Sequence, residues 1–92
     1  IAINPATGKV EATDIEGQSR QVMQNLAEVL KAAGASFDNV VKTTCFLADM
    51  KDFAAFNEVY AAYFTSYPAR SCVAVKDLPK GAACEIEAIA EK

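Results

Sequence analysis

The chain has 92 residues, of which 52% are hydrophobic and 23% are charged, and it contains no histidine. This composition predicts one packed domain over residues 1–92 and argues against disorder. The lack of histidine excludes Ser-His-Asp and Cys-His catalytic pairs and every zinc site that uses His. Nine basic and twelve acidic residues give a net charge of −3. Nucleic acid is therefore a poor first guess as partner, because phosphate binding normally needs a cationic patch.

The cysteine pattern and the hydropathy of the chain indicate where the protein works. Cys45, Cys72 and Cys84 are odd in number and form no Cys-x-x-Cys motif. This argues against a disulfide framework and against a thiolate metal cage, so we expect no metal and a reducing cytoplasm. No apolar run approaches the roughly 20 residues of a membrane span, and no basic-then-apolar leader opens the chain. We therefore expect no membrane partner.

The first third of the chain predicts a turn and a long helix. The first ten residues have the pattern of a strand end that enters a turn rich in Asn, Pro and Gly. Thr13 and Glu16 match a capping box, in which the two side chains satisfy free amides at a helix start. Apolar residues then recur at helical spacing. We predict a helix over Asp14–Ala33, which Gly34 ends in a left-handed conformation.

The remaining residues predict a strand, a second helix and two further strands. Residues 40–47 are β-branched and aromatic without helical spacing, which is typical of a strand. Aromatic residues then repeat at helical spacing from Phe53 to Phe64, so we expect a helix that ends before the next proline. Two apolar runs, 69–75 and 83–90, flank a short turn with proline and glycine and predict a hairpin.

This order of elements predicts an α+β fold with two helices packed on one face of a mixed β-sheet. Side chains along a strand alternate between the two faces. If the helices cover the faces that carry Ile86 and Val73, the last two strands present a second face that mixes charged and apolar groups. Such a face suits a ligand cleft or a subunit interface. It would carry Arg70, Cys72, Glu85 and Glu87.

Each candidate residue has a chemical and a plain structural interpretation, and the strand pattern alone does not choose between them. Arg70 can hold a carboxylate or phosphate with two parallel hydrogen bonds, or form an ion pair with Glu85 or Glu87. Glu85 can be a general acid or base, or a solvent-facing carboxylate. Cys72 can line a pocket or act as a small hydrophobe. Asn57 can contact substrate or tie down a loop.

Several segments closely resemble the signature of the RidA family, the reactive intermediate deaminases. The resemblance covers essentially every residue of the chain. The combination of the Pro-Ala-Arg and Glu-Ile-Glu-Ala-Ile-Ala motifs at this spacing is more specific than any single motif. The matching C-terminal segments are Tyr67-Pro68-Ala69-Arg70-Ser71-Cys72-Val73, Leu78-Pro79-Lys80-Gly81 and Glu85-Ile86-Glu87-Ala88-Ile89-Ala90.

The resemblance implies a chorismate-mutase-like fold, a homotrimer with sites at the subunit interfaces, and no metal or organic cofactor. It implies hydrolysis of 2-imino acids, such as 2-iminobutanoate and 2-iminopropanoate, to 2-keto acids and ammonia. The partner is then a small 2-imino or 2-keto acid. Arg70 would bind the substrate carboxylate, Glu85 would activate water, and Cys72 would line the catalytic pocket. Asn57 and Tyr67 match substrate-binding positions.

Two further expectations accompany this resemblance. The alternative function is that of a non-enzymatic member that binds a small ligand or affects translation through RNA. Family chains carry an N-terminal hairpin before the position that corresponds to Ile1. We therefore expect the chain to be an N-terminally incomplete piece of a longer parent, with lower stability and weaker deaminase activity than that parent.

Overall fold

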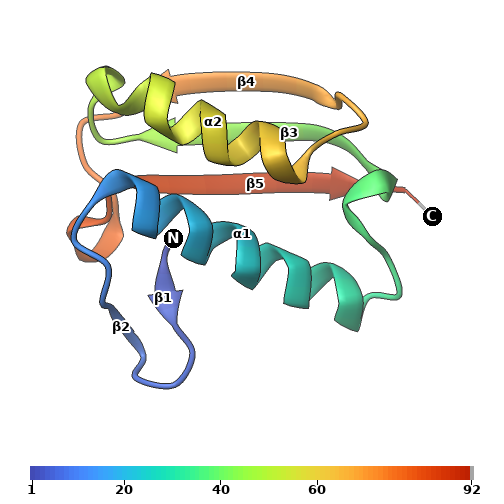
Figure 1. Ribbon diagram of the computed structural model, residues 1–92, viewed down its shortest axis with the longest axis horizontal. Coiled ribbons are helices and arrows are strands. Elements are labelled where there is room, and N and C mark those ends of the chain that lie inside the picture. The colour runs from blue at the N-terminus through green and yellow to red at the C-terminus, as the bar shows by residue number, and fades with distance from the viewer. Residues whose placement is uncertain (92) are drawn as a thin grey trace.

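The computed structural model describes residues 1–91 and contains two α-helices and five β-strands (Figure 1). The predicted helices and longer strands are present, with ends within a few residues of those expected. The opening turn is itself flanked by a short antiparallel pair, β1 with β2, which the sequence analysis did not predict. The elements are β1 Ile3–Asn4, β2 Lys9–Val10, α1 Ile15–Ala32, β3 Val40–Leu47, α2 Phe53–Tyr63, β4 Ala69–Ala74 and β5 Cys84–Ala90.

The main sheet has the strand order β4-β3-β5, with β3 parallel to β4 and antiparallel to β5. The predicted hairpin of the last two strands is therefore wrong, because β4 and β5 lie on opposite sides of β3. The reason is the connection between β3 and β4. Parallel neighbours need a long crossover, and α2 is that crossover. Within residues 1–91 the outer edge of β4 stays free, and β5 pairs with the other edge of β3, where it also packs against α1.

The ends of α1 differ in how well they were predicted. The N-cap is Asp14 and not Thr13, because Asp14 Oδ1 accepts a hydrogen bond from the Gly17 N–H at 2.7 Å. The predicted capping box of Thr13 and Glu16 is therefore wrong: the N-cap lies one residue later, and Gly17 has no side chain that could complete a box. At the other end Gly34 has a φ of 73°, which confirms the left-handed conformation. The chain then turns towards β3.

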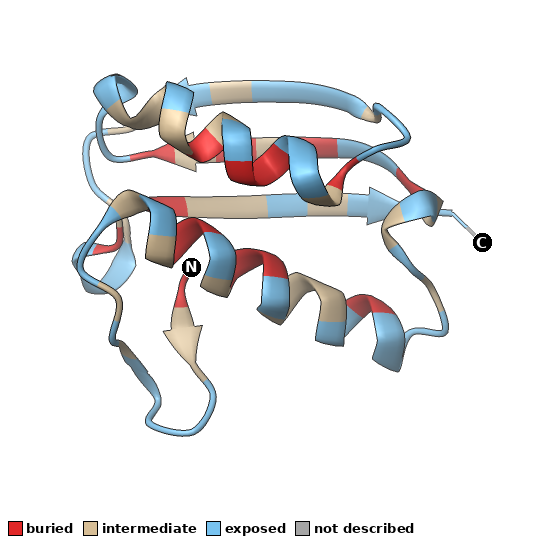
Figure 2. Cartoon of the chain, in the orientation of Figure 1, coloured by how far each residue is buried: buried red, intermediate tan, exposed pale blue. Residues whose placement is uncertain are grey.

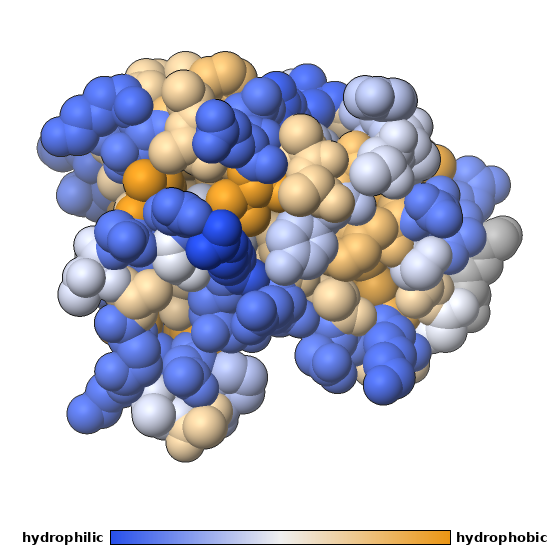
Figure 3. Space-filling view, in the orientation of Figure 1, coloured by the Kyte–Doolittle hydropathy of each residue, from blue (hydrophilic) through white to orange (hydrophobic). Residues whose placement is uncertain are grey.

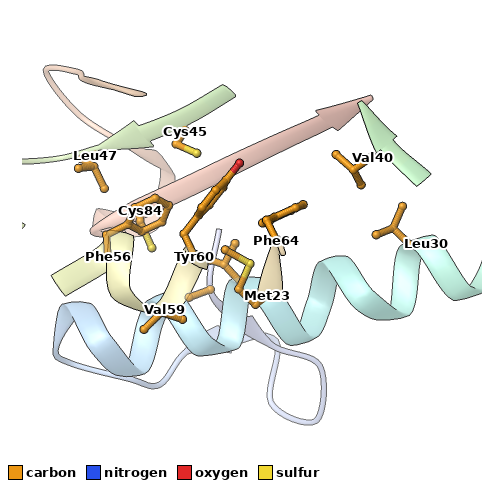
Figure 4. Close-up of a cluster of buried hydrophobic side chains, with 12 residues drawn as sticks. Met23, Leu30, Val40, Cys45, Leu47, Phe56, Val59, Tyr60, Phe64 and Cys84 are labelled. Atoms are coloured by element: carbon orange, nitrogen blue, oxygen red, sulfur yellow. The ribbon is translucent and has the colours of Figure 1, made fainter. Parts of the chain in front are cut away.

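Both helices pack on the same face of the sheet, as predicted (Figure 1). The buried segments lie on the inner sides of the helices and along β3 (Figure 2). Side chains from both helices and the strands meet in one apolar core, of which Figure 4 is a close-up. Its members are Ala2, Val22, Met23, Leu30, Val40, Cys45, Leu47, Phe56, Val59, Tyr60, Phe64 and Cys84.

The pairing register decides which side chains face the helices. Thr43 on β3 is buried and bonds to a side chain of α2, and its partner on β4 is Arg70. Partners in register project from the same face, so Arg70 lies on the helix-covered face. Phe46 is three residues further along β3 and is the partner of Glu85. Since strand side chains alternate, Glu85 lies on the other face, which we call the open face.

The prediction that Arg70, Cys72, Glu85 and Glu87 share one face is therefore wrong. Arg70 and Cys72 lie on the helix-covered face, and Glu85 and Glu87 lie on the open face. The prediction assumed that the helices cover Val73, but Val73 is 46% exposed. Alternation along a strand determines which residues share a face, but not which face receives the helices.

Candidate active site

Arg70 lies on the edge strand β4, under α2, and its guanidinium has three neighbours from that helix. Nη1 donates a hydrogen bond to Asn57 Oδ1 at 2.6 Å. Cζ lies 4.6 Å from the centroid of the Tyr60 ring and 5.5 Å from that of Phe53. Aromatic faces attract a cation at these distances. Because a guanidinium has five N–H donors, the contact with Asn57 leaves others for a ligand.

A pocket of about 280 Å³ opens in front of Arg70. Most of its wall is apolar or aromatic, and the polar groups gather at Arg70 and Asn57, so it suits a small ligand with one anionic end and a short apolar body. Tyr67 stands at its rim, 91% exposed and with a φ of 55°, where a residue with a side chain is strained. The lining residues are Asn57, Tyr60, Ala61, Phe64, Tyr67, Pro68 and Arg70.

Tyr60 connects this pocket to the core of the protein. Its hydroxyl lies 2.7 Å from Thr43 Oγ1, and both residues are buried. Figure 4 shows the hydroxyl directed toward the strands. Burial raises the pKa of Tyr60, so the phenol is neutral near pH 7. The helical spacing of the aromatic residues between Phe53 and Phe64 did not indicate a contact of Tyr60 with Arg70, although a spacing of three residues puts the Asn57 and Tyr60 side chains on one helix face.

Comparison with known proteins assigns the family. The family model described as endoribonuclease L-PSP matches residues 1–92. The chain belongs to this family. A RutC family protein of Pyrococcus horikoshii is 53% identical over 93 residues, which span 100% of the chain and 74% of that relative. The 2-iminobutanoate/2-iminopropanoate deaminase of Escherichia coli is 48% identical over 94 residues, which span 98% of the chain and 73% of that relative.

Solved structures agree with this assignment. The crystal structure of Escherichia coli TdcF with bound serine superposes with a TM-score of 0.94 at 42% identity, and the match spans 100% of the chain and 75% of that protein. The fold is therefore the fold of this family. Relatives that carry the deaminase name confirm the resemblance to the RidA family.

The thiols near the pocket of this family member are neutral. Burial raises the pKa of Cys45 to about 12. Burial also raises the pKa of Cys72, and the neighbouring Arg70 guanidinium offsets part of that effect. Because the thiolate is the nucleophilic form, Cys72 is a half-buried neighbour of the arginine and not an activated nucleophile. Among the described residues it is not part of the pocket lining.

Glu85 is separated from the pocket within one chain. It is half-buried on the open face, and within residues 1–91 its side chain forms no ion pair and no hydrogen bond. The structural alternative of an ion pair from Arg70 to Glu85 or Glu87 is therefore absent from the described part of the chain. Asn57, Tyr67 and Arg70 line one pocket, Cys72 lies beside Arg70 outside that lining, and Glu85 lies on the opposite face of the sheet.

A second hollow, of about 290 Å³, lies between α1 and α2. Hydrophilic side chains cover much of this side of the molecule, with patches of hydrophobic atoms between the helices (Figure 3). Glu16 and Arg20 form an exposed ion pair of 2.6 Å in its lining, which contains none of the predicted site residues. In the described range no group of three or more His, Cys, Asp or Glu side chains is placed to hold a metal ion. No helix within residues 1–91 is long and apolar enough to cross a membrane.

Proposed function

We propose that the protein hydrolyses 2-imino acids, such as 2-iminobutanoate and 2-iminopropanoate, to 2-keto acids and ammonia. One observation carries the proposal: Arg70 is held by Asn57 and Tyr60 at the polar end of a small pocket with apolar walls. A 2-imino acid has the matching shape, with a carboxylate at one end and a short alkyl chain at the other. Relatives named 2-iminobutanoate/2-iminopropanoate deaminase support the choice, as does the bound serine of TdcF, which is itself a small α-amino acid.

The reaction needs water, a proton carrier and a fixed substrate. Water adds to C2, so that a C–O bond forms and a proton passes to the imine nitrogen. A second proton then passes from the new hydroxyl to the nitrogen, the C–N bond breaks, ammonia leaves, and the carbonyl of the keto acid remains. Because the imine carbon is already electrophilic, positioning and proton transfer suffice, and no metal or organic cofactor enters this scheme. Arg70 holds the carboxylate through two parallel hydrogen bonds, which its planar fork permits.

Glu85 is the proposed proton carrier, and it serves a site on a neighbouring copy of the chain. Within one chain the sheet separates Glu85 from the carboxylate held at Arg70, because the two residues project from opposite faces. The open face also exposes Val73 and Ile89, at 46% and 60%. Packing this face against another copy buries apolar surface in a small domain. We therefore place the site between neighbouring copies of a homotrimer.

The remaining site residues shape the pocket. Asn57 fixes one nitrogen of the guanidinium, and Tyr67 forms an outer wall that a neighbouring copy can cover. Cys72 shares the helix-covered face with Arg70 and supplies a neutral thiol beside the site. None of these three groups needs to ionise during the reaction.

The deciding experiment measures release of 2-oxobutanoate from freshly generated 2-iminobutanoate, with and without the protein. We expect the protein to accelerate release and Arg70→Ala to abolish most of that acceleration. Arg20→Ala is the matched control, because Arg20 is the other arginine of the chain and lies in an exposed ion pair away from the pocket. A parent protein that leaves the uncatalysed rate unchanged contradicts the proposal.

The family description suggests a second function, cleavage of RNA. The net charge of −3 counts against it, since RNA binding is driven by neutralisation of phosphates. Both activities are measured on one preparation. Cleavage of a single-stranded RNA without any acceleration of imine hydrolysis favours the nuclease.

A further inference from the structure

We propose that Thr43 and Tyr60 are positioning residues for Arg70: their buried hydrogen bond holds the Tyr60 ring against the guanidinium and so sets the affinity of the site for carboxylates. The inference rests on the proposed function only for the identity of the bound carboxylate. Neither residue needs to touch the substrate for this role. The contacts form a chain from the centre of the sheet to the pocket, in the order Thr43, Tyr60, Arg70.

The Tyr60 ring is held at two places. Its hydroxyl lies 2.7 Å from Thr43 Oγ1 in the buried layer between α2 and the sheet. Its ring stacks on Phe64, with centroids 4.5 Å apart and an interplanar angle of 27°. A buried hydroxyl without a hydrogen-bond partner lowers the stability of the folded protein. The phenol is therefore held within hydrogen-bond distance of Thr43. The ring that faces Arg70 is thus fixed by Thr43, which lies outside the pocket, and by Phe64, which forms part of the pocket wall.

The guanidinium depends on that ring for its orientation. Arg70 is itself exposed, and a long exposed side chain would otherwise sample many rotamers. Tyr60 at 4.6 Å, Phe53 at 5.5 Å and the bond to Asn57 restrict it to one arrangement before any ligand arrives. A preorganised group loses less entropy on binding, which strengthens binding without a new contact. If the Tyr60 ring loses its fixed position, carboxylate binding should therefore weaken while the rate of the chemical step stays the same.

Two conservative variants remove the same hydrogen bond from its two ends. Thr43→Val keeps the shape of the side chain, and Tyr60→Phe keeps the ring that faces the guanidinium. In each we expect the Kd for 2-oxobutanoate and the KM for 2-iminobutanoate to rise about five- to tenfold, the range of one buried hydrogen bond. We expect kcat to change less than about twofold, because Glu85 and the water are untouched.

The double variant separates positioning from general damage. If both single changes act through one hydrogen bond, Thr43→Val combined with Tyr60→Phe raises Kd no more than the stronger single change. Tyr63→Phe is the matched control on the same helix, because the Tyr63 ring packs against Phe37, at 5.6 Å between centroids, and does not line the Arg70 pocket. We expect its Kd and KM to equal those of the parent.

A second readout follows the guanidinium itself in the ligand-free protein. The NMR resonances of the Arg70 side chain should be displaced by the neighbouring rings and should move in Thr43→Val and Tyr60→Phe but not in Tyr63→Phe. If the single variants change neither the Arg70 resonances nor Kd, the inference is overturned. It is also overturned if the losses of binding free energy from the two single changes add up in the double variant. If Tyr60→Phe does not fold by circular dichroism, Thr43→Val alone decides by the same measurements. If the parent neither binds 2-oxobutanoate nor hydrolyses the imine, the proposed function fails, and the resonances alone decide the inference.

Discussion

The helix-covered face and the open face belong to the same three strands but hold their polar groups differently. On the covered face Thr43 bonds to Tyr60, and Arg70 bonds to Asn57. On the open face the side chains of Glu85 and Glu87 form no ion pair within residues 1–91. Packing under the helices removes water from Thr43, so its hydroxyl needs a protein partner, whereas Arg70 is exposed at the sheet edge and is held by α2. On the open face water or another copy of the chain can serve instead.

This difference separates two tasks within one small sheet. Groups with fixed partners are preorganised and suit the binding of a ligand. Groups without partners are free to meet a neighbouring subunit or to exchange protons. Changes on the covered face should therefore alter carboxylate binding, whereas changes on the open face should alter assembly and turnover.

The largest expected effect is on the covered face, at Arg70. Arg70→Lys and Arg70→Ala should each lower kcat/KM for 2-iminobutanoate about a hundredfold or more, because one ammonium cannot reproduce two parallel hydrogen bonds. Steady-state release of 2-oxobutanoate measures the loss, and Arg20→Lys serves as the control. Activity of Arg70→Lys at the parent level would remove Arg70 from carboxylate binding.

The second effect joins the two faces across subunits. Glu85→Gln should lower kcat while binding of 2-oxobutanoate persists, since the amide keeps the shape and loses proton transfer. Co-refolding of Glu85→Gln with Arg70→Ala should restore about one quarter of the parent activity if every site combines two copies of a symmetric assembly. Mixed assemblies that stay inactive would mean that both groups act from one chain.

The third effect concerns assembly through the open face. Light scattering of the parent should give the mass of three chains, and Ile89→Asp should shift it towards one chain, because a charge at a packed apolar contact is costly. Val29→Asp is the control, since Val29 is 65% exposed on α1, outside the sheet. A parent mass of 9.8 kDa at micromolar concentration would falsify the trimer.

The smallest effect is on stability at high pH. Burial raises the pKa of Cys45 from 9.0 to about 12 in the folded protein. Between these values the unfolded chain has released the proton and the folded chain still binds it, so the free energy of unfolding falls as pH rises. For one proton the slope is at most about 1.4 kcal/mol per pH unit. Denaturant unfolding between pH 9 and pH 11 gives the free energy of unfolding at each pH. We expect this free energy to fall less steeply with pH in Cys45→Ala than in the parent, and an equal dependence on pH would argue against the raised pKa.

The sequence by itself determined the kind and the extent of the main elements. The predicted helix over 14–33 is observed over 15–32, and the predicted strand over 40–47 has the same bounds in the structure. These features depend on spacing within one segment and on single turn residues such as Gly34. The motifs around Arg70 and Glu85 likewise placed the chain in its family, because they are contiguous in sequence.

Only the tertiary structure decided which strands are neighbours and which face the helices cover. The bond between Thr43 and Tyr60 spans 17 residues, and that between Asn57 and Arg70 spans 13. Strand alternation puts Arg70 on one face of the sheet and its neighbours Ala69 and Ser71 on the other. The same alternation would hold whichever of the two faces the helices covered. Pairing and coverage depend on contacts between segments far apart in the chain. These contacts place Tyr60, a core residue, against Arg70 as well, and they place Glu85 on the opposite face.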